Sequence, residues 1–545
     1  ALQDDEQFGV AEIEDHAGGG AVGGPRSLAV LKGQVVGDGV AQGSDGLGVL
    51  SRTHAVEAGI ANRAPFGVVG DVKLTTTLTP PEEANQTVRL NLGTKDGVKS
   101  MRIGFTDQRL TAHGGLAVWT RFITERGLRE QLRAVLPHAP TSPNAYDPTD
   151  TALGFIGGIL CGADKLARVA HLAHDPAVAE VLGIEAVPSQ STLSRFFARC
   201  GRSAGESLSG LHRWAVQELP ARRDGYTLDL DSFSLIHEDG HQEGVRVGYT
   251  RKGLKPCHRP IVAALAEVPL VAHFWLRPGN TACVSGANIF LGDTLARLPA
   301  TVRVTLVRAD SGFCTQGMIT ELESRGLHYV MTAALRSPVR ALCRHDEAAW
   351  TPTEVRGIDV QDLTVEGARL VVLRQRVTDR PNAGGKKLLE VPGYKFQALR
   401  TNLPSALSAL EVWRRYNGRA DIENRIKELG TQFGLKGLCC RSFWATEAAC
   451  HLAICAYNLC VGLQRRLGQP QRAELTTLRR RLFACAAVFS HAAGKPTLKL
   501  AVPTAKRRHW WRVLLHQMAA PDDCYAVAAL SARAGPHQLI WPSIA

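Results

Sequence analysis

The sequence predicts an α/β protein in which one sheet is accompanied by helices before and after it. Some segments alternate apolar and polar residues, others are runs of aliphatic and β-branched residues, and a helical period separates the last two of these runs. The predicted strands are 226–231, 245–249, 261–272, 302–307 and 327–331, and the predicted helix covers 315–325. Strands that come first and then alternate with helices are typical of an α/β core.

Residues 1–100 differ in kind from the rest of the chain. They hold 17 of the 53 glycines, neither cysteine nor methionine, and no sustained period, and the first methionine is Met101. We therefore expect a disordered or poorly packed region, or an over-extended reading frame.

Charge is also unevenly distributed along the 545 residues. Residues 1–100 carry 8 basic and 13 acidic side chains, and the remaining residues carry 56 and 38, a net charge of +18. A positive field of this size favours a polyanionic partner such as nucleic acid. A basic surface without a specific partner is the alternative.

A helical period runs over residues 110–219. Within it, Pro188–Phe197 predicts a turn followed by a helix, with Ser189 or Ser191 as its cap. A polar helix N-terminus with Arg195 nearby suits contact with phosphate or a DNA groove, as in a helix-turn-helix. A plain capped helix in an all-helical domain is at least as good an interpretation.

The 13 cysteines match no ladder of CxxC pairs, so neither a disulfide scaffold nor a zinc ribbon is expected. Cys450, Cys455 and Cys460 are predicted to be small buried residues of one helix. The surrounding apolar stretch, 445–464, contains Glu447, His451 and Asn458, so it is not expected to span a membrane. No signal peptide is apparent in residues 1–20, and we expect a reducing cytoplasm.

Acidic residues near strand ends are the first candidates for chemistry, since the chain has no GxxxxGK[ST] phosphate loop. Asp229 and Asp231 are two residues apart and therefore share one face of the predicted strand. A carboxylate flanked by apolar residues faces a cleft, binds a cation or meets a basic partner. Either residue is a candidate ligand, and solvation of both on an open sheet face is the alternative.

Asp310 follows the predicted strand 302–307 and precedes a Ser-Gly turn. Open α/β sheets bind their ligands at this position, beyond the carboxyl end of a strand. The alternative is that Asp310 caps the helix that begins near Thr315, although a cap normally lies closer.

The segment 416–429 predicts a helix with a polar face beside an apolar stripe. Tyr416, Arg419, Glu423 and Lys427 fall within an arc of roughly 80°. The neighbouring stripe consists of Ile422, Ile426 and Leu429. For this segment alone, a solvated helix with ion pairs at i, i+4 is the obvious alternative.

Together, Asp231, Asp310 and Glu423 favour a site for two divalent cations. Two hard cations about 3.5–4 Å apart need several oxygen ligands, which two Asp and one Glu supply. One cation would activate water or a 3′ hydroxyl for in-line displacement at phosphorus, and the other would stabilise the leaving oxygen. Nearby Arg and Lys side chains would bind phosphates.

Three segments resemble the motif blocks of bacterial insertion-sequence transposases of the DDE type, in the branch with a Tyr-Arg-Glu-Lys signature. They are Leu228–Ser232, Arg308–Phe313 and Tyr416-x-x-Arg419-x-x-x-Glu423, and the resemblance covers about residues 101–467. It implies a ribonuclease-H-like core with a β-rich insertion and cut-and-paste transposition of DNA. The expected segments are 1–100 (disordered or over-extended), 101–222 (helical, DNA-binding), 223–335 (first part of the core), 336–402 (β-rich insertion), 403–470 (helical second part of the core) and 471–545 (basic C-terminal region).

The resemblance implies Asp231, Asp310 and Glu423 as catalytic residues and ligands of two Mg²⁺ ions, with Mn²⁺ as a substitute. Asp229 is the less favoured first ligand, because the family's strand usually continues with Ser or Thr. The implied partners are double-stranded DNA, at the transposon ends and at the target, and a second copy of the chain in a synaptic homodimer, with no membrane. The expected location is the bacterial cytoplasm, at the nucleoid.

Tyr416 and Arg419 match the signature's DNA-contacting pair. The signature Lys falls at Gly430, which puts the hairpin step of this branch in question, and Lys427, one turn after Glu423, is expected to substitute. We also expect Arg425 and Arg195 to contact DNA. The basic segments Arg479–Arg481 and Lys506–Arg512 have two equally favoured interpretations. They either bind phosphates and stack on bases, or form a packed helix with peripheral arginines.

The leading hypothesis is therefore a transposase that binds terminal inverted repeats and cleaves and joins DNA strands. A metal-dependent nuclease without strand transfer and a non-catalytic DNA-binding descendant are the alternatives. Retention of all three carboxylates favours an enzyme over the descendant.

Overall fold

The computed structural model describes residues 88–519, except 95–96, 138–141, 143–144, 239–240, 366, 439 and 470. All described residues belong to one unit, Ala84–Ala545. Most of the region expected to be disordered or over-extended, residues 1–87, lies outside the described residues. Strand β1 (Val88–Thr94) pairs antiparallel with β2 (Gly97–Ile103), so the expected boundary at residue 100 falls inside a strand.

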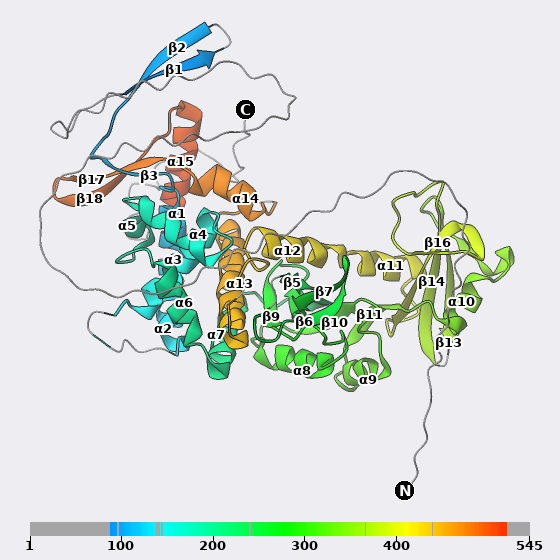
Figure 1. Cartoon of the computed structure of the whole chain (residues 1–545). Helices are drawn as coiled ribbons and strands as arrows, with labels where there is room; N and C mark the ends of the chain where they lie inside the picture. Colours follow the sequence, from blue (N-terminus) through cyan, green and yellow to red (C-terminus); the bar gives the residue numbers. More distant parts are fainter. Residues whose placement is uncertain are drawn as a thin grey trace, which may run out of the picture. The chain divides into compact units, whose positions relative to one another are not determined.

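A mixed sheet of ten strands confirms the α/β class (Figure 1). Its order is β12-β13-β14-β16-β11-β10-β4-β8-β9, with β15 beside β16. The strands are β4 (Tyr226–Ser232), β8 (Ile261–Leu265), β9 (Val271–Trp275), β10 (Val304–Ala309), β11 (His328–Ala333), β12 (Thr351–Pro352), β13 (Ile358–Val365), β14 (Ala368–Arg376), β15 (Lys386–Leu388) and β16 (Val391–Thr401). β4, β10 and β11 run parallel, and β8 is antiparallel to β4 and β9. The predicted strand 261–272 is thus a pair, β8 and β9.

Helices cover both faces of the parallel strands, which explains their nearly continuous apolar sequence. Figure 1 shows α8 (Ala287–Arg297) and α9 (Gln316–Ser324) on one face and α11 (Ala409–Asn417) and α12 (Ala420–Thr431) on the other. Thr315 caps α9, because its side chain accepts a hydrogen bond from the backbone of Met318. Asp310 is therefore not the cap of that helix.

The β-rich segment 336–402 continues the main sheet. β16 pairs with β11 on one side and with β14 on the other. The three strands β11, β16 and β14 are therefore neighbours in one continuous sheet. Two further apolar clusters cover this part of the sheet, one with Trp413 of α11 and the other with Trp350 and Phe396. The short helices here are α10 (Ser337–Cys343) and the 3-10 turn Glu347–Ala349.

Residues 116–216 are helical, as predicted. The helices are α1 (Leu116–Glu125), α2 (Leu128–Val135), α3 (Pro148–Cys161), α4 (Leu166–Ala170), α5 (Val178–Leu182), α6 (Gln190–Ala198) and α7 (Arg202–Val216), with a 3-10 turn at His171–His174. Ser189 is the cap of α6, since its side chain accepts a hydrogen bond from the backbone of Thr192 at 3.1 Å.

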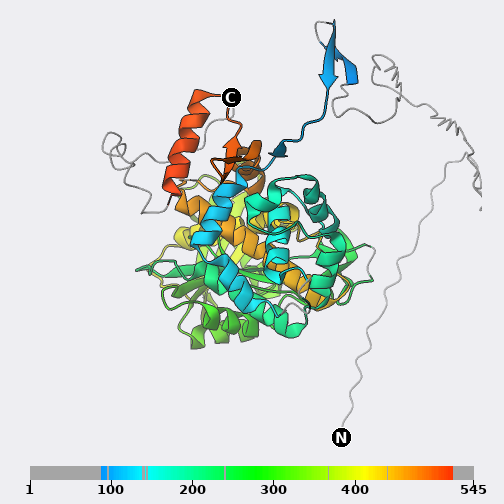
Figure 2. The same ribbon diagram turned by 90° about the vertical axis from the view of Figure 1, so that its left-hand side faces the viewer.

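Helix α13 (Phe443–Arg466) is the core of this helical region although it lies far along the chain. It contacts α1, α3, α6 and α7, and also β9 and α12, and Figures 1 and 2 both show it among the earlier helices. Cys450, Cys455 and Cys460 are buried in it, which confirms their prediction as small core residues. Among the described residues α13 alone is long and apolar enough to cross a membrane, but 94% of its most apolar window is buried, as in a core helix.

Two small sheets complete the described chain. One has the order β5 (Leu235–Ile236), β7 (Gly253–His258), β6 (Arg246–Thr250), so the predicted strand 245–249 lies outside the main sheet. The other has the order β18 (Lys495–Leu500), β17 (Ala487–Ala492), β3 (Arg109–Thr111). The remaining helices are α14 (Leu475–Leu478), the π turn Arg479–Phe483 and α15 (Ala505–Gln517).

Replacing Glu447 of α13 with glutamine is expected to flatten the dependence of stability on pH. Burial raises the pKa of its carboxyl from 4.5 to about 7, and Glu206 adds to the effect. Between these values the unfolded chain has released a proton that the folded protein retains, so stability falls as pH rises. At about 1.4 kcal/mol per pKa unit, the loss is about 3 kcal/mol. Urea unfolding at both ends of this range measures it.

Glutamine retains the oxygen that accepts a hydrogen bond from the backbone of Leu276, 3.0 Å from Glu447 Oε1. The exposed Glu130 of α2, changed to glutamine, is the matched control and should keep the wild-type pH dependence. If the stability of the Glu447→Gln protein depended on pH as that of the wild type does, the raised pKa assigned to the Glu447 carboxyl would be wrong.

Candidate active site

The two predicted aspartates lie side by side at the carboxyl ends of two neighbouring parallel strands. In the β4–β10 ladder, Asp229 is paired with Arg308. Asp231 and Asp310 lie two residues further along their strands, so both follow on the same face of the sheet. This is the edge at which open α/β sheets bind ligands.

Asp229, the alternative first ligand, is engaged by Arg308. Its carboxylate is fully buried and accepts two hydrogen bonds from that guanidinium, from Nε at 2.6 Å and from Nη2 at 2.8 Å. Burial raises the pKa of Asp229, and Arg308 opposes this. A carboxylate with both oxygens held in this way is a structural group, which leaves Asp231 as the predicted ligand.

Arg308 also connects the sheet to the helices above it. Its Nη1 donates to the backbone oxygen of Arg415 in α11 at 2.5 Å. A Cβ on Gly418 would lie 2.4 Å from the same nitrogen, so only glycine allows this close approach. Arg308 stands in the second sequence motif, two residues before Asp310, and this spacing could have indicated a partner for Asp229.

Asp231 is desolvated and close to other carboxylates. Its residue is 8% exposed, and its Oδ1 accepts a hydrogen bond from the backbone of Ser232 at 2.7 Å. Burial raises the pKa of Asp231 to about 6; Arg419 opposes the shift, and Asp310 and Glu423 reinforce it. The negative charges of the three predicted carboxylates therefore act on one another.

Arg419 lies between two of these carboxylates. Its Nη2 is 3.1 Å from Asp231 Oδ2, and its Nη1 is 3.8 Å from Glu423 Oε1. Although burial alone would lower the pKa of Arg419, Asp231 and the neighbouring acids raise it, so the buried side chain is charged. Glu423 Oε2 also lies 3.5 Å from Nη2 of Arg251.

The predicted single helix 416–429 is two helices. α11 ends at Asn417 and α12 begins at Ala420, with Gly418 and Arg419 between them. The apolar stripe predicted for this segment is present, since Ile422 and Leu429 are buried. The close contact of Arg308 with Gly418 accounts for the position of the break.

The donor chemistry of the site suits a hard divalent cation, but the carboxylates do not form a closed ligand set. Asp231, Asp310 and Glu423 offer only oxygen donors, which Mg²⁺ prefers. Asp310 Oδ1 accepts a hydrogen bond from the backbone of Gly312 at 2.9 Å. Within residues 88–519 as described, no three His, Cys, Asp or Glu side chains lie close enough together to hold a metal ion.

The five residues predicted to contact DNA lie in different environments. Lys427 and Arg195 are exposed, on α12 and α6. Tyr416 is half-buried, and its hydroxyl is hydrogen-bonded to that of Thr332. Arg419 is buried between the carboxylates.

The prediction for Arg425 is wrong. This side chain is buried, and it donates to the backbone oxygens of Leu265 at 2.6 Å and Ala266 at 3.2 Å. Those carbonyls end β8, so Arg425 anchors α12 to the sheet. A position three residues from Ile422 lies beside the apolar stripe, which the sequence could have shown.

A lysine absent from the sequence prediction covers Gly430. A Cβ at residue 430 would lie 2.9 Å from Cε of Lys436, so the Lys436 side chain occupies the space that a side chain at 430 would take. The predicted substitute, Lys427, lies on the same helix, α12. Two exposed lysines are therefore available near the position of the missing signature residue.

The tryptophans of the basic C-terminal segments are packed while several cations remain exposed, which favours a packed helix with peripheral arginines over base stacking. Trp510 and Trp511 of α15 are buried, so they are not free for base stacking. Arg479 donates to the backbone oxygens of Leu160 at 2.7 Å and Ile159 at 3.2 Å, at the C-terminal end of α3. These residues stabilise the helical region.

Arg277 and Arg259, which no sequence motif indicated, shape the loop beside Asp231. Buried Arg277 donates to three backbone oxygens of this loop, those of Ala282, Cys283 and Ser285. Ser232 directly follows Asp231, and its Oγ lies 3.1 Å from Cys283 Sγ. The same sulfur lies 3.3 Å from Nη2 of Arg259. In the sequence Arg259 and Arg277 flank the β8–β9 hairpin, and this is the available sequence signal.

Two segments match hydrolase motifs but occupy unsuitable elements. His237-Glu238-Asp239-Gly240-His241 has the HExxH spacing, which binds zinc when it lies on a helix, but β5 precedes it and His237 and Glu238 are not helical. Gly201–Gly205 has the GxSxG spacing of a strand-to-helix elbow, but it follows helix α6 and begins helix α7. Neither supports a hydrolase.

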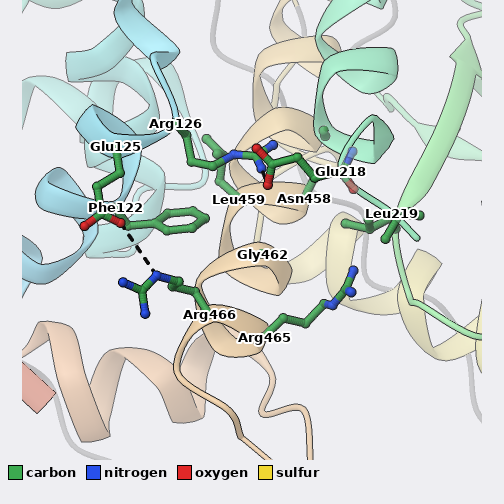
Figure 3. A pocket seen from close by; sticks show the side chains of 12 residues that line it. Phe122, Glu125, Arg126, Glu218, Leu219, Asn458, Leu459, Gly462, Arg465 and Arg466 are labelled. Carbon is green, nitrogen blue, oxygen red and sulfur yellow. Dashed lines mark ion pairs between the residues drawn. The ribbon is translucent and has the colours of Figure 1, made fainter. Parts of the chain in front are cut away.

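A pocket of about 380 Å³ lies between α1, α7 and α13 (Figure 3). Its charged residues are mostly paired: Arg126 with Glu218, and Arg466 with Glu125 at 3.7 Å. Burial and then the nearby Arg465 lower the pKa of Arg126. The ion pairs join the three helices, and the pocket holds none of the predicted catalytic residues.

Comparison with known proteins gives one informative match. The family model described as transposase DDE domain group 1 matches residues 94–520. No curated protein matches the chain. A cryo-EM structure of the piggyBac transposase synaptic complex with hairpin DNA is similar at 12% identity, covering 69% of this chain and 81% of that one, with a TM-score of 0.38. The Drosophila P element transposase strand transfer complex is similar at 9% identity, covering 77% and 95%, with a TM-score of 0.20. Similarity this weak carries no weight, so the family match alone bears on function.

Proposed function

Since the chain belongs to the transposase DDE domain group 1 family and is thereby a DNA transposase, we propose that it performs cut-and-paste transposition of an insertion sequence. The observation that carries this proposal is the placement of Asp231 and Asp310 on adjacent parallel strands, with Glu423 joined to Asp231 through Arg419. The enzyme would bind the terminal inverted repeats and act as a homodimer that holds both ends.

The sheet supports a ribonuclease-H-like core. Five strands of the main sheet form this core, in the order β9-β8-β4-β10-β11. Only β8 is antiparallel to its neighbours, β4 and β9. Asp231 lies next to the last residue of β4, Asp310 directly follows β10, and α12 brings Glu423 to the same edge.

In the proposed mechanism Asp231, Asp310 and Glu423 would hold two Mg²⁺ ions, with Mn²⁺ as a substitute. When bound, such ions supply an activated nucleophile and stabilise the leaving oxygen. The desolvated Asp231 must lose its proton to serve as a ligand, so its charge is available above about pH 6. Arg308 fixes Asp229 and α11, and thereby the relative position of β4, β10 and the helices.

Arg419 and the lysines would bind the DNA backbone. The Arg419 guanidinium reaches both Asp231 and Glu423, so it can exchange a carboxylate for a phosphate without a large movement. Lys427 and Lys436 are exposed and can contact phosphates as point charges, and exposed Arg195 can contact them through its planar guanidinium.

An in vitro assay with candidate element ends tests the proposal. With Mg²⁺ the full chain is expected to nick the ends and join them to a target duplex, and chelation by EDTA should stop both reactions. Cleavage without joining would indicate the metal-dependent nuclease instead. Binding of the ends with neither reaction would indicate the non-catalytic descendant and contradict the proposal.

A further inference from the structure

The hairpin formed by β6 and β7 has an exposed apolar face. Val247, Tyr249 and Leu254 are 60%, 70% and 70% exposed. Tyr249 is paired directly with Leu254, and Val247 with Pro256, so these side chains share one face of the two strands. A tyrosine and two aliphatic residues that are exposed together on one face of a hairpin indicate a binding surface.

The opposite face holds the hairpin rigidly against the protein. A Cβ on Gly248 would lie 2.0 Å from the backbone oxygen of Gly279, and one on Gly279 would lie 2.0 Å from that of Cys257. The two backbones are therefore in direct contact. Thr250 closes the turn by donating to the backbone oxygen of Gly253 at 2.8 Å. The exposed face is thus pre-formed.

Short contacts connect this face to the candidate active site. Arg259 donates from Nη1 to the backbone oxygen of Tyr249 at 3.1 Å and from Nη2 to Cys283 Sγ at 3.3 Å. Cys283 in turn contacts Ser232, the neighbour of Asp231. At the tip of the hairpin, Arg251 lies 3.5 Å from Glu423.

The charges around the face suit a polyanion. Arg246, Arg251 and Lys252 are exposed, and the Arg251 side chain is 92% exposed. An ion pair as exposed as that of Arg251 with Glu423 contributes little, so Arg251 is free to exchange Glu423 for a phosphate. Lys255 is paired with Glu238 at 3.6 Å.

We propose that Val247, Tyr249 and Leu254 form a stacking surface for unpaired DNA bases beside the cleavage point, with Arg251 and Lys252 binding the adjoining phosphates. The proposal rests on the proposed function, which brings DNA to Glu423. An aromatic ring flanked by cations is the usual means of binding single-stranded nucleic acid. A stable protein interface needs about 20–30 residues a side, many more than this face offers.

Binding of two DNA probes by the full-length protein tests the proposal. One is a short blunt duplex, and the other is the same duplex with a single-stranded extension that contains 2-aminopurine. Tyr249→Ala is expected to weaken binding of the extended duplex about tenfold while blunt duplex binding stays within about twofold. The wild type should quench the 2-aminopurine fluorescence and Tyr249→Ala should not. Tyr249→Phe should behave as the wild type.

The matched control is Ile289→Ala, which removes an apolar side chain that is 65% exposed on α8 and should leave both affinities unchanged. Equal affinities of Tyr249→Ala and wild type, or an equal loss on both probes, would overturn the proposal. A change of sedimentation behaviour in Tyr249→Ala would assign the face to a second copy of the chain and would also overturn it.

These outcomes are separable from failure of the proposed function. If the wild type neither cuts nor joins DNA, the proposed function fails, but selective loss of extension binding in Tyr249→Ala still supports the stacking surface. If the wild type cuts and joins DNA and Tyr249→Ala binds both probes normally, only the stacking surface is refuted.

Discussion

Glu423→Gln is expected to reduce DNA cleavage by about 10³-fold or more while the protein stays folded and binds DNA. A ligand of a catalytic cation contributes several kcal/mol to the stabilisation of transition-state charge, and each 1.4 kcal/mol is about tenfold in rate. Glutamine keeps the size of the side chain and removes its charge. Cleavage of labelled element ends under single-turnover conditions measures the rate, and band shift measures binding.

The structural contribution of Glu423 is small, so a loss of cleavage cannot be attributed to unfolding. Its side chain is 51% exposed, and its ion pairs with Arg251 and Arg419 span 3.5 and 3.8 Å. The pair with Arg251 is exposed on both sides and contributes about 0–1 kcal/mol, and buried Arg419 keeps Asp231 as its closer partner at 3.1 Å. Asp421→Asn changes an exposed acid on the same helix and should cleave at the wild-type rate. Cleavage by Glu423→Gln at the rate of this control would remove Glu423 from the active site.

Arg308→Met is expected to lower the free energy of unfolding by about 3–5 kcal/mol, because it leaves the buried Asp229 without its cation. The variant also loses the hydrogen bond from Nη1 to Arg415 in α11. Urea unfolding followed by circular dichroism measures the change. DNA cleavage should decrease in parallel, since Arg308 orders both strands that carry the aspartates.

A second variant separates the unpaired charge from lost packing. Asp229→Leu combined with Arg308→Met removes both charges and should recover most of the stability, because buried ion pairs replaced by apolar residues are often neutral. Arg202→Met breaks an exposed pair with Glu206, whose side chains are 76% and 62% exposed, and should cost less than about 1 kcal/mol. If Arg308→Met is no more destabilised than Arg202→Met, the structural role assigned to Arg308 is wrong.

Local patterns predicted much of the fold. The alternation in 226–231 and the aliphatic run in 302–307 became β4 and β10, and Ser189 caps α6. These features depend on neighbouring residues, which a single sequence contains. The placement of Asp231 and Asp310 side by side also follows from strand ends in a parallel sheet.

Features that depend on distant residues could not be predicted in the same way. Whether 336–402 forms its own sheet or extends the main one is decided by the pairing of β16 with β11. The helix break at Gly418 depends on Arg308, more than a hundred residues earlier. The helical period places Arg425 beside the apolar stripe, but its carbonyl partners could not be predicted because they depend on the position of β8.

The late position of α13 in the chain affects how the protein is made. Val216 ends α7 and Arg466 ends α13, so the ribosome adds about 250 residues after the first seven helices before their central partner emerges. At roughly 5–20 residues per second, this interval lasts about 10–50 s. During that time the apolar surfaces of α1, α3, α6 and α7 that α13 later covers remain open on the nascent polypeptide. Until α13 emerges, these uncovered surfaces are the part of the nascent chain that is most open to aggregation.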